Sequence, residues 1–342
     1  MRVVYYTPDY QVVLTRRCAY VCGYCNFTNT PSPLPASRKQ FRQWLRTASR
    51  LGARQVTLTA GEGITGQPEI VSTTRYYGFE GWYDYICCLC RLVLEHNGRE
   101  PLYPQIDIGS IPFADLLKMR PYSPLIKLMT HSADDSLQDK PAHAKAPHKT
   151  FRQRLAALED AGQVGMRVAT GIMIGIGENP DSWTRAAEAV SKSHHRHGNI
   201  EHFIIKPFQP MRFSAMGNLP PASDEALLSA IRAVRDHLDT RIPLVADLQD
   251  RLHLVPAAMN EGMDDLGDLR IGSTEHINFD LPSALDAVKQ STTKAGIQIC
   301  ERKLPVSRTP CRKSVLPGAC PNGYDNGQGK LALSPASGNI CL

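Results

Sequence analysis

Short apolar runs rich in β-branched residues alternate along the chain with longer amphipathic stretches. The first run, Val12 to Leu14, leads into a cysteine-rich loop, and the second, Gln55 to Thr59, leads into Gly61-Glu62. Further strands are expected at residues 105–108, 126–129, 168–174, 203–205 and 244–246, and helices at residues 37–51, 82–96, 113–119, 151–161, 182–194 and 224–237. At least six strand–helix repeats in one direction predict an α/β fold, a complete or partial (β/α) TIM-like barrel. A doubly wound open sheet is the second candidate.

The pattern changes after about Pro305. Residues 307–342 are rich in Pro, Gly, Ser and Asn and have little apolar periodicity. We therefore predict one barrel domain over residues 1–306 and a poorly structured tail over residues 307–342. Cys311, Cys320 and Cys341 lie in this tail; they are more simply interpreted as incidental cysteines than as ligands of a second cluster.

Composition excludes several classes of function. The net charge of +6 is mild, and no dense basic stretch alternates with aromatic residues, so nucleic-acid binding is not indicated. No apolar run reaches the length of a membrane span, and the first residues lack the apolar core of a secretory signal. We expect a cytoplasmic protein that acts on a small-molecule substrate and keeps its cysteines free or bound to metal.

Three of the ten cysteines, Cys18, Cys22 and Cys25, follow the first strand with the spacing C-x3-C-x2-C. Three thiolates on one loop can hold three irons of a 4Fe–4S cluster and leave the fourth iron open to a small molecule. A zinc knuckle is the alternative, but the next cysteine is Cys87, too far along the chain for a compact zinc motif. The run Cys87-Cys88-Leu-Cys90 lies in an apolar helical stretch and is interpreted as core packing.

Two other strand ends carry candidate chemistry. Gly61 lets the backbone approach a ligand closely, and Glu62 can bind an ammonium group. The strand from Thr170 ends in Gly175-Ile-Gly177-Glu178, whose glycines can admit a ring or a ribose. This second stretch does not open a helix as a dinucleotide fingerprint does.

An open iron beside a carboxylate and a glycine-rich strand end suits S-adenosylmethionine (SAM), whose amino and carboxylate groups can chelate the iron. We therefore expect a 4Fe–4S cluster that reductively cleaves SAM and releases a 5′-deoxyadenosyl radical, which abstracts hydrogen from a small substrate. The barrel interior would shield this radical from water and oxygen. Tyr24 is placed to lie against the adenine, or else to pack under the loop.

The pattern Cys18-x3-Cys22-x-Tyr24-Cys25 resembles the signature of radical SAM enzymes. The wider sequence, over about residues 3–306, resembles the CofG-type subunit of deazaflavin (FO) synthase. Stretches that carry this second resemblance are Val3-Val-Tyr-Tyr-Thr-Pro8, Cys22-Gly-Tyr-Cys-Asn-Phe27, Gly61-Glu62, His143-Ala-Lys-Ala-Pro-His-Lys149 leading to Arg154, Thr170 to Glu178, and Gly262 to Gly267.

The resemblance implies closure of a deazaflavin ring on an adduct of tyrosine and a ribityl-uracil, the FO-forming step of coenzyme F420 biosynthesis. It also implies a one-electron donor such as flavodoxin or ferredoxin, and a companion radical SAM subunit that supplies the adduct. Asp265 is expected at the barrel rim, near substrate.

The chain departs from the FO-synthase pattern where substrate is expected. The affected segments contain Asp107, His131, His202 and Lys206. Because a buried lysine favours an anionic group, one hypothesis is a paralogue that applies the same radical chemistry to an anionic or amino-acid-derived substrate. The other is a diverged FO synthase subunit. A third reading, from a different class, is a non-catalytic iron–sulfur or zinc protein.

Overall fold

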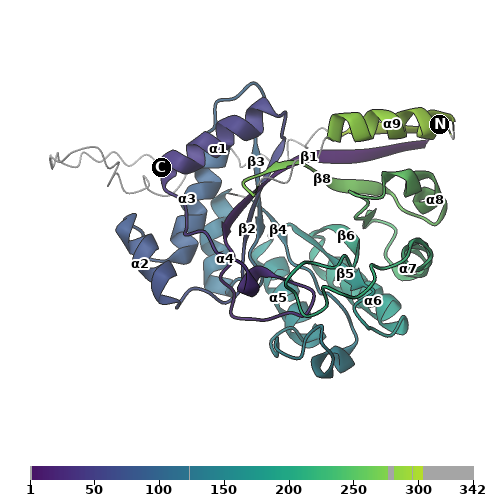
Figure 1. Cartoon of the computed structure of the whole chain (residues 1–342), viewed down its shortest axis with the longest axis horizontal. Helices are drawn as coiled ribbons and strands as arrows, with labels where there is room; N and C mark the ends of the chain where they lie inside the picture. The colour runs from purple at the N-terminus through teal and green to yellow at the C-terminus, as the bar shows by residue number, and fades with distance from the viewer. Residues whose placement is uncertain (1, 123, 276–280, 295, 303–342) are drawn as a thin grey trace.

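The computed structural model describes residues 2–122, 124–275, 281–294 and 296–302. In this part of the chain eight parallel strands close into a barrel in sequence order, because β1 pairs with both β2 and β8, and helices surround the strands (Figure 1). This closure confirms the barrel and rejects the open sheet.

The strands are β1 (Arg2–Thr15), β2 (Gln55–Ala60), β3 (Tyr103–Asp107), β4 (Leu125–Lys127), β5 (Val168–Ile174), β6 (Ile200–Pro207), β7 (Leu244–Ala246), β8 (Asp265–Ser273) and β9 (Ile297–Glu301). The α-helices are α1 (Arg38–Arg50), α2 (Pro68–Tyr76), α3 (Trp82–Leu94), α4 (Phe113–Met119), α5 (Phe151–Val164), α6 (Asp181–His197), α7 (Asp224–His237), α8 (Val255–Asn260) and α9 (Leu281–Lys294). Short 3₁₀ helices lie at Phe27–Asn29, Arg120–Tyr122, Asp135–Asp139 and Leu252–Leu254.

Side-chain caps explain why several helices begin where they do. Ser37, Thr150 and Ser223 each have a side-chain oxygen that accepts a hydrogen bond from a backbone N–H three residues later. Such caps satisfy donors that the first helical turn leaves free. At the other end, α5 and α6 stop at Gly165 and Gly198, which adopt left-handed backbone angles.

β1 is much longer than its predicted segment because it serves two partners on one side. Its first half, from Arg2 to Tyr6, pairs with β9, and its second half, from Asp9 to Thr15, pairs with β2. β8 lies along the other side of β1. The strand that leads into the cysteine loop is therefore held on both edges.

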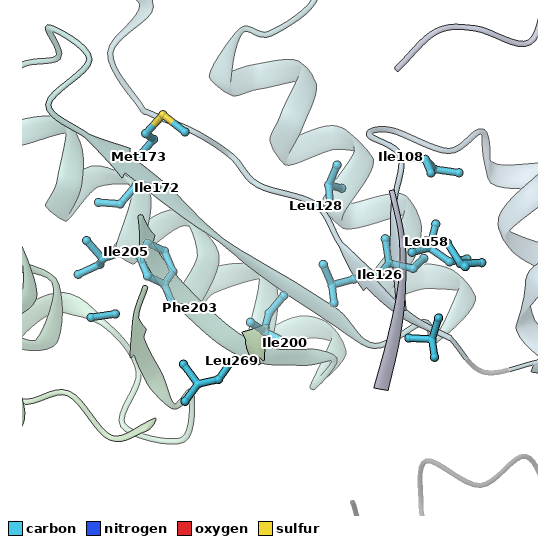
Figure 2. Close-up of a cluster of buried hydrophobic side chains, with 14 of the residues drawn as sticks. Leu58, Ile108, Ile126, Leu128, Ile172, Met173, Ile200, Phe203, Ile205 and Leu269 are labelled. Carbon is cyan, nitrogen blue, oxygen red and sulfur yellow. The ribbon is translucent and has the colours of Figure 1, made fainter. Parts of the chain in front are cut away.

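The barrel strands alternate in polarity. Leu58, Ile126, Ile172, Phe203 and Ile205 are buried in the main hydrophobic core, where Figure 2 shows several of them. Residues one position away on the same strands line an internal cavity, as Thr57 and Thr59 do on β2. Because successive side chains on a strand point to opposite faces, the apolar face packs under the helices and the polar face points into the barrel.

A second, small apolar cluster closes the barrel below this cavity. It consists of Leu125, Ala169, Ile204 and Val245, with Met129 packed against it. On β4, β6 and β7 these residues stand two positions before the cavity-lining Lys127, Lys206 and Asp247, so they share the inward face at a lower level.

Other predictions concern single segments. Cys87, Cys88 and Cys90 are buried within α3, as the core interpretation predicts. Cys88 is disulfide-bonded, however, so the expectation that the cysteines stay free or bound to metal is wrong for this residue. The tail and its three cysteines lie outside the described residues. Within the described ranges, no helix combines the length and the apolarity needed to span a membrane.

Candidate active site

The three cysteines of the motif line one cavity of about 550 Å³ at the carboxyl end of the barrel. Their loop is tied to two neighbouring loops by backbone hydrogen bonds. The N–H groups of Val21 and Gly23 donate to the carbonyls of Lys145 (3.1 Å) and Ala142 (2.9 Å), and the carbonyl of Gly23 accepts from the N–H of Met216 (2.8 Å). The loops after β4 and β6 therefore fix the cysteine loop over the cavity.

Two glycines allow this close packing. A Cβ atom at Gly23 would lie 2.1 Å from the carbonyl oxygen of Pro141, and one at Gly61 would lie 1.9 Å from that of Arg17. Neither distance is compatible with a side chain. Gly61 was predicted to let a ligand approach; it lines the cavity, but its immediate neighbour is the cysteine loop itself.

Cys18, Cys22 and Cys25 are free thiols. The sulfur of Cys18 accepts hydrogen bonds from the N–H groups of Tyr20 (3.4 Å) and Glu62 (3.3 Å). Burial raises the pKa of Cys18 and Cys25 above the ordinary thiol value, so metal binding has to displace their protons. The two N–H groups are positioned to stabilise the resulting thiolate at Cys18.

The donor set fits a multi-iron cluster better than a single ion. Among the residues that the structure describes, no three His, Cys, Asp or Glu side chains are grouped to hold one metal ion. A zinc site needs four ligands around one point, whereas a 4Fe–4S cluster takes one thiolate on each of several irons. Three thiols on one loop facing a common cavity meet the second requirement.

Glu62 lines the cavity and is engaged by a buried arginine. Its carboxylate accepts two hydrogen bonds from Arg154 (2.9 and 2.5 Å) and one from the N–H of Ser110 (3.0 Å), and Lys149 Nζ lies 3.9 Å away. Burial alone would raise the pKa of Glu62, but Arg154, Lys149 and Ser110 together lower it. Glu62 is therefore an ionised carboxylate with an internal partner before any ligand ammonium reaches it.

Tyr24 is held by two imidazoles beside the cysteine loop. Its hydroxyl lies 3.4 Å from His131 Nδ1 and 3.3 Å from His143 Nε2. Burial, Lys149 and Arg154 lower the pKa of both histidines, that of His143 to about 4. Because both rings are neutral, a nitrogen of one ring can accept a hydrogen bond from the Tyr24 hydroxyl, while an N–H group of the other ring donates a hydrogen bond to it. Tyr24 is thus fixed in the cavity wall, with no contact that distinguishes adenine stacking from packing.

The predicted substrate residues divide into two groups. Asp107, His131 and Lys206 line the cavity, and Lys206 Nζ lies 4.0 Å from Asp247 Oδ2. His202 is buried on β6 but does not line the cavity. It shares the inward face with Ile204 and Lys206 and lies one level below Ile204, in the apolar closure of the barrel.

Asp265 is not at the expected place. It is the first residue of β8, at the amino end of the barrel, whereas the cysteine loop is at the carboxyl end. Its carboxylate pairs with Arg302 and accepts a hydrogen bond from the N–H of Gly267 (2.6 Å). The loop position expected for Asp265 is wrong, because the residue lies within strand β8.

The strand end from Thr170 to Glu178 also lies outside the cavity, apart from Met173. Thr170 is buried on the outward face of β5. The carboxylate of Glu178 accepts hydrogen bonds from the N–H groups of Gly175 and Ile176 (both 2.9 Å) and from the indole of Trp183 (3.1 Å). Gly175 and Gly177 adopt left-handed angles in the turn that Glu178 closes. Here the glycines serve the turn that joins β5 to α6.

Several cavity residues were not identified from the sequence. Lys149 and Arg154 belong to a stretch noted only for its resemblance. Asp9 and Lys127 alternate with apolar neighbours on β1 and β4, whereas Asp268 lies on β8, which also contains Asp265 and Arg270. This alternation within a predicted barrel was the signal that could have revealed a polar interior.

Residues 12–190, more than half of the 342 residues, match the family described as the radical SAM superfamily. The chain belongs to the radical SAM superfamily. The matched region contains the cysteine loop, Glu62 and Arg154.

Curated relatives indicate which group of radical SAM enzymes this chain resembles. The chain is 28% identical to 7,8-didemethyl-8-hydroxy-5-deazariboflavin synthase of Methanothermobacter thermautotrophicus, over 89% of this chain and 91% of that protein. It is also 28% identical to the synthase of the same name from Thermosynechococcus vestitus, over 89% and 92% of the two chains. This radical SAM protein is therefore an enzyme of the synthase type that resembles the CofG proteins.

Solved structures agree on the fold. Methylornithine synthase (PylB) aligns with a TM-score of 0.62 and 17% identity, over 87% of this chain and 83% of that chain. The hydrogenase maturase HydG from Carboxydothermus hydrogenoformans aligns with a TM-score of 0.64 and 14% identity, over 87% and 67%. At these identities the likeness concerns the barrel alone.

Proposed function

We propose that this radical SAM enzyme holds a 4Fe–4S cluster on Cys18, Cys22 and Cys25, binds SAM beside it, and catalyses a ring-forming step like that of deazaflavin (FO) synthesis. When bound, the cluster supplies one electron that splits SAM into methionine and a 5′-deoxyadenosyl radical, which then abstracts a hydrogen atom from the substrate. The convergence of the three thiols on an internal cavity is the observation that carries the proposal.

The chain's own residues support the cofactor part of this proposal. Lys149 lines the cavity and carries a positive charge suited to the carboxylate of SAM. Glu62 suits its ammonium group, while Arg154 and Ser110 keep the carboxylate ionised and oriented. Tyr24 and the backbone at Gly61 form part of the adjoining wall. We place SAM against these residues.

The choice of reaction rests on similarity along nearly nine tenths of the chain and on the polar walls. A uracil or ribityl group is bound by amides, carboxylates and cations. The cavity provides Gln11, Asp107, Asp247, Asp268 and Arg270. The departures noted in the sequence therefore did not leave the cavity without such groups.

A paralogue that acts on an anionic or amino-acid-derived substrate is the second candidate, and Lys206 in the cavity wall is the observation that favours it. Its charge is partly compensated, however, because Asp247 lies 4.0 Å from its ammonium group and both side chains are about 40% exposed. An exposed lysine with a carboxylate neighbour selects anions only weakly. We therefore place FO-type synthesis first.

The proposed function also implies binding partners and a cellular compartment for this protein. We expect an electron donor such as flavodoxin or ferredoxin, and a reducing cytoplasm suits the free motif thiols. A companion radical SAM subunit is also expected. The chain matches FO synthase of Nocardia farcinica over 87% of its own length but only 35% of that longer protein.

The test is anaerobic reconstitution with iron and sulfide, followed by reductant, SAM and the tyrosine–uracil adduct. We expect 4Fe–4S absorption, release of 5′-deoxyadenosine and formation of deazaflavin.

Cys22→Ala should lose the absorption and the SAM cleavage, whereas Cys300→Ala, a matched change on β9, should retain both. A colourless zinc form that does not cleave SAM would reject the enzyme. SAM cleavage with hydrogen abstraction from an anionic substrate, and no deazaflavin, would favour the paralogue.

A further inference from the structure

Four polar side chains form a second site deep in the cavity, here called the cavity floor: Asp9, Thr57, Lys127 and Asp268. They come from β1, β2, β4 and β8 and line the barrel interior, where the strand register sets Asp9 beside Gln55 of β2 and Arg270 of β8. Asp9 precedes the end of β1 at Thr15 by six residues, which corresponds to about 20 Å along the strand. The cavity floor therefore lies well below the cysteine loop, at the other end of the same cavity.

Hydrogen bonds fix the two carboxylates of the cavity floor. Asp9 Oδ1 accepts from Thr57 Oγ1 (2.6 Å) and from Gln55 Nε2 (3.3 Å). Asp268 Oδ2 accepts from Gln105 Nε2 (2.8 Å), a fully buried side chain of β3. Both carboxylates are thus held in defined orientations by neutral donors, an arrangement typical of a prebuilt binding site.

Lys127 presents a cation in the middle of this site. Among the described residues, its ammonium group has no hydrogen-bond acceptor and no carboxylate within 4 Å. Asp268, Asp107, Asp247 and Asp9 nevertheless surround it at longer range and, against the opposing effect of burial, raise its pKa. Lys127 therefore remains charged and directs donors into the cavity.

The charges restrict what this site can bind. An anionic group at the cavity floor would meet the carboxylates of Asp107 and Asp268, and a cationic group would meet Lys127. A hydroxyl group is uncharged and can donate to a carboxylate while it accepts from the ammonium group. Several adjacent hydroxyls satisfy all these groups at once.

We propose that the cavity floor binds the uncharged, polyhydroxylated end of an elongated substrate and thereby holds the other end beneath the cysteine loop. This inference rests on the proposed function, because it assigns a specificity site to the same cavity. Lys127 and Asp268 would be its specificity-determining residues.

The experiment measures binding of two matched ligands to the reconstituted holoenzyme by calorimetry, with SAM present and reductant absent. The ligands are a ribityl-uracil and its 5′-phosphate ester, which adds nearly two negative charges to the hydroxylated end. We expect the uncharged ligand to bind at least tenfold more tightly. Equal affinity, tighter binding of the phosphate or no binding of either ligand would overturn the proposal.

Variants of two cavity-floor residues test whether this site causes the difference in affinity. Lys127→Met and Asp268→Asn should each weaken binding of the uncharged ligand about tenfold. Lys118→Met, a matched change on the surface of α4, should bind both ligands like the wild type. Asp268→Asn keeps the acceptor for Gln105, so it remains informative if Lys127→Met fails to fold. Wild-type affinity in a folded Asp268→Asn variant would contradict the assignment.

Failure of the reaction and failure of the site are distinguishable. If both variants form deazaflavin with the KM of the wild type, the proposed function is retained, but the cavity floor is not a specificity site. An enzyme that binds the ribityl-uracil through Lys127 and Asp268 but forms no deazaflavin retains the site and loses the function.

Discussion

At the scale of single residues, the candidate site depends on charges that are buried in pairs. Arg154 is among the largest side chains that the fold buries completely, and Glu62 is its counter-ion. A paired charge of this kind costs desolvation, but removal of one partner costs more, because the other is left buried without compensation. The Arg154–Glu62 pair therefore supports the cavity wall as well as any ligand.

Arg154→Met should lower the free energy of unfolding by about 3–5 kcal/mol, as measured by urea denaturation. Arg241→Met, which removes an exposed arginine from its pair with Asp239, should lower the free energy of unfolding much less. The double variant Arg154→Met with Glu62→Gln should recover part of the loss. Equal costs for the two single variants would contradict the buried-pair interpretation.

Asp9 predicts an unusual pH dependence. Burial and the nearby Asp268 raise its pKa to about 7, although Thr57, Lys127 and Gln55 act in the opposite direction. Between the unfolded value near 4 and the folded value the native state binds more protons, so this group's contribution to stability falls as the pH rises.

Asp9→Asn removes that penalty. The stability of the variant relative to the wild type should therefore be greater at pH 8 than at pH 5, by at most about 4 kcal/mol for a shift of three pH units. Urea unfolding at both values measures it. Asp236→Asn on the surface of α7 is the matched control and should show an almost constant difference. A constant difference for Asp9→Asn as well would show that Asp9 does not bind a proton in the native state.

The role of a residue could be predicted where the residues that act together lie in one short stretch of sequence. The three cysteines reach one cavity because their spacing is local. The partner of Glu62 was not predictable, because Arg154 lies 92 positions later and no local pattern joins the two residues. The position of Asp265 was mispredicted for a related reason. Its environment depends on Arg302, a later residue that the fold places beside β8.

At the scale of elements, strands with strong periodicity were located well. β5, β7, α4 and α7 have the predicted bounds, since their apolar pattern is clear, and Ser223 also caps α7. Helix α2, strand β8, helices α8 and α9, and strand β9 were missed. β8 contains Asp268, Arg270 and two glycines, and only its pairing with β1 makes these residues a strand.

The junction between β2 and the cysteine loop gives a prediction at this scale. Gly61→Ala would place a methyl group against the carbonyl of Arg17 and displace the loop, so we expect lower thermal stability and less iron bound after reconstitution. Gly66→Ala, where the added methyl group meets no neighbour within 4 Å, is the matched control and should resemble the wild type. Normal iron content in Gly61→Ala would show that the loop tolerates the shift.

At the scale of the whole molecule, the barrel interior has a polar cavity at its carboxyl end and an apolar cluster on β4 to β7 below it, with Gln105 buried beside Leu125 in the strand register. The cluster of Leu125, Ala169, Ile204 and Val245 closes the lower end, and the cavity occupies the upper end. The number of strand–helix repeats indicated a barrel, but the division of its interior depends on which alternate residues point inward at each level. That requires the strand register, which the sequence does not display.

The predicted domain boundary is open to a direct test. The composition of residues 307–342 predicts that a chain ending at residue 306 keeps the thermal unfolding midpoint and the iron content of the full chain. A chain ending at residue 294 lacks β9, which pairs with Arg2–Tyr6 of β1, and should melt several degrees lower. Loss of iron binding in the longer truncation would assign the tail a role that its composition does not suggest.

The pairing of β1 also orders events during protein synthesis. The cysteine loop leaves the ribosome early, yet Tyr5 pairs with Asp265 and Arg2 with Ile297. At translation rates of roughly 5–20 residues per second, the strand before the loop waits about 15–60 s for these partners. During that interval the motif thiols are on a nascent chain that has not closed its barrel. Insertion of the proposed iron–sulfur cluster is therefore expected only after β9 has been synthesised, and the early thiols depend on a reducing environment until then.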